Sequence, residues 1–476
     1  MKISLKKTKI VATLGPACKS KTAIHSLIKS GVNVFRINFS HAKNEEITSY
    51  LDTIRKLNSK YNYNVAILAD LQGPKIRIGE LEEDINLNKG DEISINSGKS
   101  FIGNKNGIHI SYTQFARDVK TGNQVLIDDG KYAFEVVRTN NKDKTTLKAL
   151  NKTWLKSRKG VNLPETKIST PSLTVKDIKD VKFAISLEVD WIALSFVRHG
   201  KDLIELRKII EKYSDVKIPI IAKIEKPEAL DNIDNIIKNS DGIMVARGDL
   251  GIEIPSQEVP LIQKKLVHLS KKARIPVIIA TQMMESMIEN LQPTRAEVND
   301  VANSVMDGAD AVMLSAETSI GKHPSAVVSQ ITKIINSVEY SDQIVVPADP
   351  PTIKTDRYIT KFICYHAAKT ANEINASSVT TMTHSGYTGF QLSSWRPHCN
   401  ILVFTSNKRI LCRLSLLWGV KAFYYNKQVS TDKTIEHINK ILTKSGYAKK
   451  GDMVINLAAM PVKSRGMVNT LRISEI

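Results

Sequence analysis

Eight stretches of the chain share one pattern: an apolar run rich in Val and Ile stops abruptly at charged or hydroxyl residues, and a helical stretch usually follows. Continuous apolar strands are typical of a parallel sheet whose two faces are covered by helices. Eight of them alternating with helices predict a closed (β/α)₈ barrel. The stretches are residues 9–16, 32–41, 65–74, 191–198, 219–227, 242–251, 277–286 and 311–318.

Polar side chains gather where these predicted strands end. Barrels of this kind carry their functional residues at the carboxyl ends of the strands, and eight polar endings are hard to ascribe to structure alone. We therefore expect one site at this end of the barrel. The residues concerned are Arg36, Asn38, Ser40, His41, Asp70, Ser195, Lys223, Glu225, Arg247, Asp249, Thr281, Gln282, Ser315 and Glu317.

Two local features refine the helical part of the pattern. Residues 256–273 predict a helix with Ser256 as its N-cap. Met283, Met284 and Met287 suggest a special sulfur surface, but methionines at such spacing more often pack in the core, and we expect that here.

The alternation of strands and helices is interrupted once, over residues 75–169, and it ends at about residue 345. Short alternating apolar runs between turns predict an all-β insertion, a small lid over residues 75–169, with Gly and Pro at both crossings as hinges. A Pro-rich linker at 345–352 precedes a further βα pattern. The predicted domains are barrel 1–74 and 170–344, lid 75–169, and a C-terminal α/β domain 345–476.

The composition argues against membrane proteins, exported proteins and nucleic-acid-binding proteins. No apolar run approaches the ~20 residues of a membrane span, and the start of the chain carries no recognisable export signal. The four cysteines form no C-x-x-C pair, so we expect reduced thiols in a cytoplasmic protein. The formal net charge is +20, but the basic residues are scattered and interleaved with acids. We therefore expect no membrane and no nucleic-acid partner.

Lys223 and Glu225 are two residues apart on a predicted strand, so both side chains should point the same way. Near a carboxylate and a bound anion, the lysine would stay protonated and stabilise negative charge. A structural ion pair lining the barrel is the alternative. Asp249 ends the following strand, and two converging carboxylates suit Mg²⁺.

Phosphate chemistry is suggested by two arginines. Arg36 lies inside an apolar strand, where its charge needs a partner, and Arg77 follows the third strand. Guanidinium groups bind phosphate through two parallel hydrogen bonds. The glycines Gly248 and Gly251 would let backbone N–H groups approach an anion. The chain has neither a P-loop nor the H-R-D loop of protein kinases.

These motifs, in this order, closely resemble the pyruvate kinase family. The match is dense in the barrel, looser in the last domain, and runs from about residue 8 to the C-terminus. The motifs are TKIVATLGPA, GVNVFRINFSH, ADLQGPKIRIG, DDGK, KGVNLPE, IIAKIEKPEAL, IMVARGDLG, ATQMMESM, PTRAEVNDVANSV and VMLSAET.

The resemblance implies transfer of the phosphoryl group of phosphoenolpyruvate to ADP, with Mg²⁺ or Mn²⁺ as cofactor. It implies that Lys223 stabilises the enolate, that Glu225 and Asp249 hold the metal, and that Arg36 contacts the phosphoryl group. Thr281 would lie near the route of enolate protonation. The substrate-binding residues implied are Arg36, Lys223, Ala246, Arg247, Gly248, Asp249 and Thr281; the nucleotide-binding residues implied are Asn38, His41, Arg77, Asp128 and Lys159.

The sequence departs from the family pattern around the monovalent-cation region, Asn38, Ser40 and Asp70. Leu71 replaces a familiar threonine, and Lys75 replaces a familiar glutamate. A lysine ammonium can take the place of a monovalent cation, so we expect activity without K⁺.

The last domain offers one further motif, THSGYTG, which resembles the effector-phosphate loop of the family. Thr383, Ser385, Gly386 and Thr388 could form an anion nest, and an unregulated loop is the alternative. The family also suggests a homotetramer.

Two other functions stay open from the residues alone. A metal-dependent barrel lyase or aldolase could use the same Lys, Glu and Asp, although the lid and third domain argue against it. An RNA-binding protein that retains a barrel would bind RNA in a salt-sensitive way and show no turnover.

Overall fold

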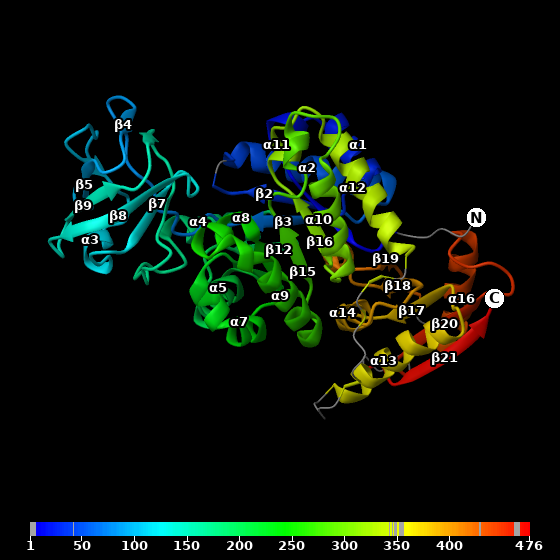
Figure 1. Ribbon diagram of the computed structural model, residues 1–476. Helices are drawn as coiled ribbons and strands as arrows, with labels where there is room; N and C mark the ends of the chain where they lie inside the picture. Colours follow the sequence, from blue (N-terminus) through cyan, green and yellow to red (C-terminus); the bar gives the residue numbers. More distant parts are fainter. Residues whose placement is uncertain are drawn as a thin grey trace.

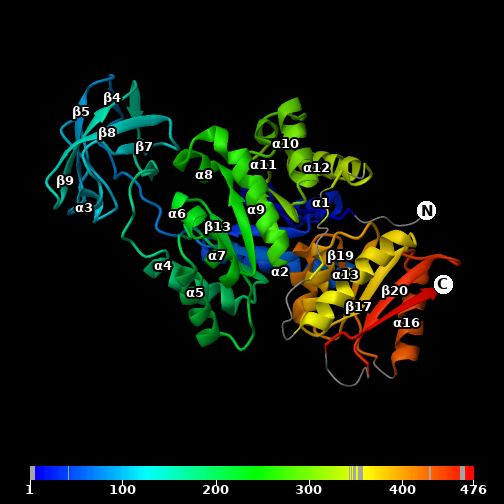
Figure 2. The same cartoon turned by 60° about the horizontal axis from the view of Figure 1, so that its bottom comes forward.

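The computed structural model describes residues 6–40, 42–341, 343–344, 346, 350–351, 357–427, 430–460 and 467–476. Three parts follow one another in space, with the β-rich insertion at one end, the barrel in the middle and the C-terminal domain at the other end (Figures 1 and 2). The predicted fold class, a (β/α)₈ barrel with an inserted β lid and a C-terminal α/β domain, is confirmed.

The barrel closes from eight parallel strands, and chain neighbours are also neighbours in space. Because helices cover the outside and side chains fill the inside, every residue of nearly all these strands is buried, as the apolar pattern predicts. The strands are β1 (Lys9–Thr13), β2 (Val34–Asn38), β3 (Ala66–Asp70), β12 (Trp191–Leu194), β13 (Ile220–Ile224), β14 (Gly242–Ala246), β15 (Val277–Ala280) and β16 (Ala311–Leu314).

Amphipathic helices follow the strands and bury their apolar stripe against the barrel. Met283, Met284 and Met287 are fully buried in this core, which confirms the expectation for them. The helices are α1 (Lys21–Ser30), α2 (Asn44–Tyr61), α4 (Val175–Ser186), α5 (Gly200–Tyr213), α6 (Pro227–Asp231), α7 (Ile233–Asn239), α8 (Arg247–Glu253), α9 (Val259–Ala273), α10 (Arg295–Met306), α11 (Ala316–Ser319) and α12 (Pro324–Glu339).

The predicted N-cap of α9 is wrong. Ser256 lies in a short 3₁₀ turn, Ser256–Glu258, and the helix proper begins at Val259 with Glu258 in the N-cap position. Pro260 occupies the first turn, where its missing N–H and fixed φ are favourable. The proline therefore sets the start of the helix, and the serine does not.

The lid has a hydrophobic core of its own, built around residues such as Phe115 and Phe134. Its main sheet has six strands in the order β11-β7-β8-β9-β5-β6, beside the pair β10-β4. The elements are β4 (Ile85–Leu87), β5 (Glu92–Asn96), β6 (Ile108–His109), α3 (Phe115–Asp118), β7 (Gln124–Ile127), β8 (Tyr132–Thr139), β9 (Lys144–Ala149), β10 (Thr153–Leu155) and β11 (Val161–Asn162).

Gly73 stands where the chain leaves the barrel for the lid. Its φ is +67°, and a Cβ there would lie 2.8 Å from Cδ2 of Phe196. A side chain at this crossing would therefore meet both backbone strain and a steric clash.

The C-terminal domain has a five-stranded sheet in the order β19-β18-β17-β20-β21, in which β21 is antiparallel to β20. Helices pack on it as in a layered α/β domain. The elements are α13 (Tyr358–Glu373), β17 (Ser378–Met382), α14 (Tyr387–Ser394), β18 (Asn400–Thr405), α15 (Lys408–Arg413), β19 (Val420–Tyr424), α16 (Thr431–Lys444), β20 (Met453–Ala458) and β21 (Thr470–Glu475).

A buried ion pair joins this domain to the base of the barrel. Nη1 of Arg396 donates to Oδ1 of Asp310 at 2.9 Å, and Nη2 donates to the carbonyl of Gly308 at 2.8 Å. The two charged side chains are only 1% and 6% exposed, so each depends on the other for its charge compensation.

Among the described residues, every helix is too short or too polar to span a lipid bilayer. The four cysteines, Cys18, Cys364, Cys399 and Cys412, are free thiols, in agreement with the expectation of reduced cysteines.

Asp310→Asn should loosen the junction between the barrel and the C-terminal domain, because it leaves the Arg396 guanidinium buried without a counter-charge. We expect a loss of about 3–5 kcal/mol, measured as a lower midpoint in differential scanning calorimetry. Asp432→Asn breaks the exposed pair between Asp432 and Arg472 and should cost less than about 1 kcal/mol. Equal midpoints for the two variants would contradict the role of the buried pair.

Candidate active site

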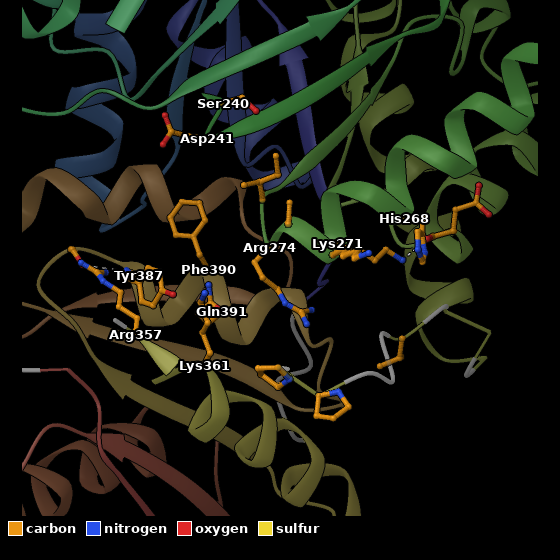
Figure 3. Close-up of a pocket in the computed structure, with 18 of the residues that line it drawn as sticks. Ser240, Asp241, His268, Lys271, Arg274, Arg357, Lys361, Tyr387, Phe390 and Gln391 are labelled. Atoms are coloured by element: carbon orange, nitrogen blue, oxygen red, sulfur yellow. Dashed lines mark hydrogen bonds between the residues drawn. The ribbon is translucent and has the colours of Figure 1, made fainter. Parts of the chain in front are cut away.

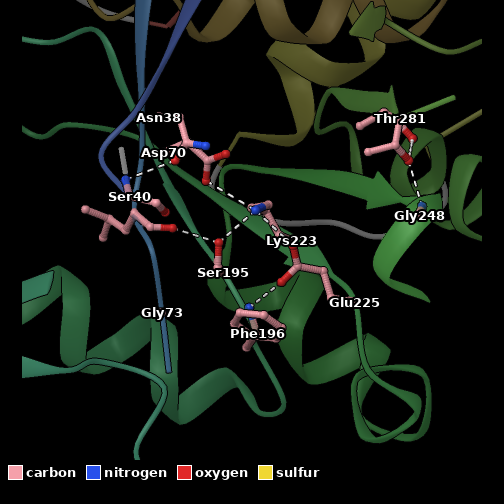
Figure 4. A network of polar contacts seen from close by, with 12 residues as sticks. Asn38, Ser40, Asp70, Gly73, Ser195, Phe196, Lys223, Glu225, Gly248 and Thr281 are labelled. Carbon is pink, nitrogen blue, oxygen red and sulfur yellow. Dashed lines mark hydrogen bonds and ion pairs between the residues drawn. The ribbon is translucent and has the colours of Figure 1, made fainter. Parts of the chain in front are cut away.

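Four charged side chains meet at the carboxyl ends of β2, β3 and β13. Figure 4 shows three of them, Asp70, Lys223 and Glu225. Nε of Arg36 donates to Oδ2 of Asp70 at 2.6 Å. Nζ of Lys223 lies 3.3 Å from Oδ1 of Asp70 and 2.8 Å from Oε1 of Glu225. Two cations and two carboxylates thus form one buried cluster, and Asp70 bridges both cations.

The register of the barrel strands creates this cluster. Thr13 pairs with Arg36 across β1 and β2, and Asn38 pairs with Asp70 across β2 and β3. Neighbouring strand ends are therefore level, and Nη1 of Arg36 reaches Oγ1 of Thr13 at 3.1 Å.

The electrostatics of the cluster favour its charged form. Burial lowers the pKa of Lys223, but Asp70 and Glu225 outweigh it and raise that pKa above its usual range. Burial raises the pKa of Asp70, but Lys223 and Arg36 reverse the effect and leave that pKa lowered. The Lys223 ammonium is consequently held protonated, and the Asp70 carboxylate is held ionised.

Glu225 and Asp249 form the candidate metal site. Asp249 lies in the first turn of α8, close enough for its charge to act on Glu225. Burial raises the pKa of Glu225, Lys223 lowers it, and the negative charge of Asp249 raises it further. Two oxygen-donor carboxylates that repel each other in a buried place suit a divalent cation such as Mg²⁺. Within the described residues there is no cluster of three or more His, Cys, Asp or Glu side chains that could hold a metal.

Thr281 sits beside the start of α8. Its hydroxyl accepts a hydrogen bond from the N–H of Gly248 at 2.7 Å and donates to the carbonyl of Ala280 at 2.5 Å. Its φ is +69°, which is strained for a β-branched residue. The guanidinium of Arg247 already has partners, because it binds Asp300 at 2.6 Å and the carbonyl of Thr281 at 2.7 Å.

The lid supplies three of the residues that the resemblance links to the nucleotide, Arg77, Asp128 and Lys159. Oδ1 of Asp128 lies 2.7 Å from Nζ of Lys159, and this hydrogen bond raises the pKa of Lys159. Arg77 donates to the carbonyl of Arg158 at 3.2 Å, so it lies on the same side of the lid. A Cβ on Gly130 would come 3.3 Å from Ile252, so this turn of the lid touches α8.

The residues predicted to surround a monovalent cation share fewer contacts with one another than the residues of the charged cluster do. Oδ1 of Asn38 accepts from the N–H of Ser40 at 3.0 Å, and Leu71 is buried. Lys75 lines a small cavity together with Asp249. Asp70, expected in this region, instead binds Arg36 and Lys223. His41 lies outside the described residues.

Sequence reasoning placed Ser195 at this end of the barrel but did not foresee its partner, and it missed Phe196. Nζ of Lys223 donates to Oγ of Ser195 at 2.7 Å, and the N–H of Phe196 donates to Oε2 of Glu225 at 2.6 Å. Both residues end a predicted strand, but nothing in the pattern pairs them with β13.

A second missed network lies under the lid hinge. Oε1 of Glu253 accepts from Asn162 at 2.8 Å and from Lys226 at 2.5 Å, and all three residues are buried. Asn162 falls inside the motif KGVNLPE and Lys226 inside IIAKIEKPEAL, and only the fold brings these two motifs together around Glu253.

The candidate effector loop precedes α14, far from the barrel mouth. Gly386 has φ +86°, and its N–H donates to Oγ1 of Thr383 at 3.0 Å. Thr388 is buried, and Oγ of Ser385 accepts from the N–H of Tyr387 at 3.4 Å. The hydroxyls of Thr383 and Ser385 thus already shape the turn.

All the comparisons with known proteins identify the same family. Residues 5–328 match the family "Pyruvate kinase, barrel domain", and residues 361–474 match "Pyruvate kinase, alpha/beta domain". Pyruvate kinases of Staphylococcus epidermidis (RP62A) and Staphylococcus aureus (MRSA252) are 38% identical over 472 and 471 residues, covering 98% of this chain and 80% of each relative. A crystal structure of a pyruvate kinase from Cryptosporidium parvum matches with a TM-score of 0.90 and 34% identity, covering 98% of this chain and 96% of that chain.

Asp70→Asn should expose the dependence of the cluster on its central carboxylate. Arg36 and Lys223 would face each other with less counter-charge, and we expect a loss of about 3–5 kcal/mol in stability. Inorganic phosphate should raise the thermal midpoint of the variant more than that of the wild type, because the anion restores negative charge between the cations. Glu289→Gln, in an exposed pair with Lys322, is the control. A variant that is as stable as this control would refute the central role of Asp70.

Proposed function

The chain belongs to the pyruvate kinase family and is a phosphotransferase, and we propose how its own residues move the phosphoryl group of phosphoenolpyruvate to ADP, giving pyruvate and ATP. The main observation that supports the proposal is the buried Lys223 ammonium, which lies between Asp70 and Glu225. A fixed positive charge at this place stabilises the negative oxygen that forms when phosphoenolpyruvate loses its phosphoryl group.

The protonation state of Lys223 separates this reaction from an aldolase that works through a Schiff base. Schiff-base chemistry needs a neutral amine, whose pKa is normally lowered by burial or by neighbouring cations. Burial acts in that direction on Lys223, but Asp70 and Glu225 raise its pKa. The side chain is thus suited to act as a fixed cation and unsuited to act as a nucleophile.

Glu225 and Asp249 would hold Mg²⁺ or Mn²⁺. The fit rests on their oxygen donors, on their mutual repulsion and on the burial of Glu225. When bound, the dication neutralises charge on the substrate oxygens. The protein's part is to fix Glu225, whose Oε2 accepts the N–H of Phe196 while Oε1 binds Lys223.

Arg36 is proposed to bind the phosphoryl group. Its Nε and Nη1 are anchored by Asp70 and Thr13, and among the described residues no hydrogen bond is found for Nη2. The anchored guanidinium would present its remaining donors to the substrate without losing side-chain freedom on binding. Phosphoryl transfer depends on such positioning and charge neutralisation more than on covalent chemistry.

Phosphoenolpyruvate would lie along the start of α8. We assign its carboxylate to the backbone of Ala246, Arg247, Gly248 and Asp249, together with Thr281. The Thr281 hydroxyl already binds the Gly248 N–H, which supports a shared position. The same hydroxyl could relay a proton to the enolate, which is then trapped as the ketone.

ADP would bind between the barrel and the lid, near Asn38, His41, Arg77, Asp128 and Lys159. The contact of Gly130 with Ile252 supports a lid that reaches α8. Closure would exclude water from the phosphoryl group and so prevent hydrolysis.

We further propose that the enzyme works without K⁺, that it is cytoplasmic, and that it assembles as a homotetramer without nucleic-acid or membrane partners. Lys75 and Asp249 line one small cavity, which supports an ammonium near the metal site. Regulation through Thr383, Ser385, Gly386 and Thr388 stays a prediction.

Lys223→Met tests the proposed function directly. A coupled assay should detect pyruvate from phosphoenolpyruvate only with ADP and Mg²⁺, and the variant should lose about 10²–10³-fold in kcat because one electrostatic stabiliser is gone. Mn²⁺ binding, followed by electron paramagnetic resonance, should persist. The exposed Lys201→Met serves as control. Pyruvate release that needs no ADP would favour the lyase, and unchanged turnover in the variant would refute the role of Lys223.

Lys75→Glu tests the cation proposal. In tetramethylammonium buffer without potassium, the wild type should retain its turnover, whereas the variant should need K⁺ because its ammonium is replaced by a carboxylate. Initial rates against K⁺ concentration measure this. A wild type that loses activity without K⁺ and regains it with K⁺ would show the proposal to be wrong.

A further inference from the structure

Three buried side chains, Asn162, Lys226 and Glu253, form a hinge network where the chain returns from the lid to the barrel. Nδ2 of Asn162 donates to Oε1 of Glu253 at 2.8 Å, and Nζ of Lys226 donates to the same oxygen at 2.5 Å. The side chains of Lys226 and Glu253 are only 6% and 0% exposed. One carboxylate oxygen thus joins β11, the residue before α6 and the end of α8.

The helix α8 connects this network to the candidate metal site. Asp249 lies in its first turn and Glu253 is its last residue, so the two carboxylates, four positions apart, lie on one face of the helix. Like charges at this spacing repel each other, and Lys226 offsets the repulsion. Because α8 has only seven residues, a displacement of Glu253 also moves Asp249.

On the lid side, Asn162 belongs to the strand pair that ends at the residues linked to the nucleotide. β11 pairs with β7 in antiparallel register. Asp128 directly follows β7, and its N–H donates to the carbonyl of Gly160 at 3.0 Å. Lys159, which binds Asp128, precedes β11. A shift of these lid residues therefore reaches Asn162 through a single strand pair.

The other anchors of the lid crossings lead to different elements. The N–H of Gly73 donates to Oδ1 of Asp177 on α4 at 3.0 Å. Arg198, beyond β12, donates to the carbonyls of Ile168 and Thr170. Of these three anchors, the one through Asn162 is the one that binds the helix of the metal site.

The hinge network lies at the mouth of the barrel. Asn162 and Lys226 line one small cavity together with Asp249. A cavity of ≈ 1440 Å³ opens at the opposite end of the barrel, between the end of α9 and the C-terminal domain (Figure 3). Of the described residues that line it, none belongs to the hinge network.

Stability alone is a weak explanation for the pair of Lys226 and Glu253. Desolvation of two buried charges offsets most of their attraction, so such a pair contributes little net stability. Oε2 of Glu253 is also buried and finds no hydrogen-bond partner among the described residues, which adds a further penalty. A costly carboxylate between the lid return and the metal site favours a role in positioning.

We propose that Glu253 is a positioning residue, which couples the lid to the metal site through Asn162 on one side and Asp249 on the other. With the link to Asn162 intact, α8 holds the Asp249 carboxylate where it shares a dication with Glu225. The inference rests on the proposed metal site and adds what controls its affinity. Since coupling between two sites is reciprocal, the lid return becomes better ordered when the metal site is filled.

Mn²⁺ binding to the full chain, without substrate or nucleotide, tests the coupling by electron paramagnetic resonance. Asn162→Ala removes the lid link but no metal ligand, and we expect its Kd for Mn²⁺ to rise about five-fold or more, the lower end of common coupling strengths. Lys226→Met with Glu253→Leu replaces the ion pair by apolar side chains, which buried sites tolerate. In that background, Asn162→Ala should change the Kd less than about two-fold, because Asn162 acts through Glu253.

Asn58→Ala is the matched control. Asn58 and Asn162 are both 9% exposed, and the Asn58 amide binds the backbone N–H and carbonyl of Val65 at the base of the barrel. Asn58→Ala should lower the thermal midpoint about as much as Asn162→Ala does, yet leave the Kd for Mn²⁺ within about two-fold, because the sites share no partner.

Hydrogen–deuterium exchange gives a second measurement that does not use turnover. Mn²⁺ should slow exchange over residues 161–170 in the wild type and leave it unchanged in Asn162→Ala. Mn²⁺ binding that is lost in Asp249→Asn but unaffected by Asn162→Ala would refute the coupling and leave the metal site standing. Equal changes of Kd in Asn162→Ala and Asn58→Ala would also overturn the coupling. Unchanged binding in Asp249→Asn, or no binding by the wild type, would refute the proposed metal site and the coupling with it.

Discussion

The structure depends on charge neutralisation at a buried point, where Asp70 binds both Arg36 and Lys223 and Glu225 completes the set. Isolated charges in such a place would be expelled or neutralised by proton transfer. Here the carboxylates raise the pKa of Lys223 and the cations lower the pKa of Asp70, so the central ion pair stays charged at the mouth of the barrel. An anionic substrate then meets positive charges that are already oriented, and little reorganisation is left for the reaction itself.

The surroundings of the cluster connect it to the lid. Glu253 ends α8, the helix that carries Asp249, and it binds Asn162 on the strand where the chain returns from the lid. Lys226, just after β13, neutralises Glu253. The hinge, the helix of the candidate metal site and the strand of Lys223 thus share one buried hydrogen-bonded unit. A lid movement that disturbs this unit also acts on the groups that would hold the metal.

The two ends of the barrel use buried charge differently. At the mouth, every buried cation of the cluster has a carboxylate beside it. At the base, Arg396 has Asp310, but Arg274 has an aromatic ring and an unused donor. The first arrangement is complete within the chain, whereas Nη1 of Arg274 finds no hydrogen-bond partner among the described residues.

Much of this protein follows from local patterns. Apolar runs and turns determined eight barrel strands, an inserted β domain and a third α/β domain, because burial on two faces dictates residue type position by position. The same patterns marked Lys223, Glu225 and Asp249 as chemical residues. The partners of these residues did not follow from local patterns. The link of Asp70 to two cations and the contact of Ser195 with Lys223 arise from the register of strands across the closed barrel, and the contact of Asn162 with Glu253 arises from the packing of a lid strand against α8. Such contacts join residues tens to hundreds of positions apart, so only the tertiary structure decides them.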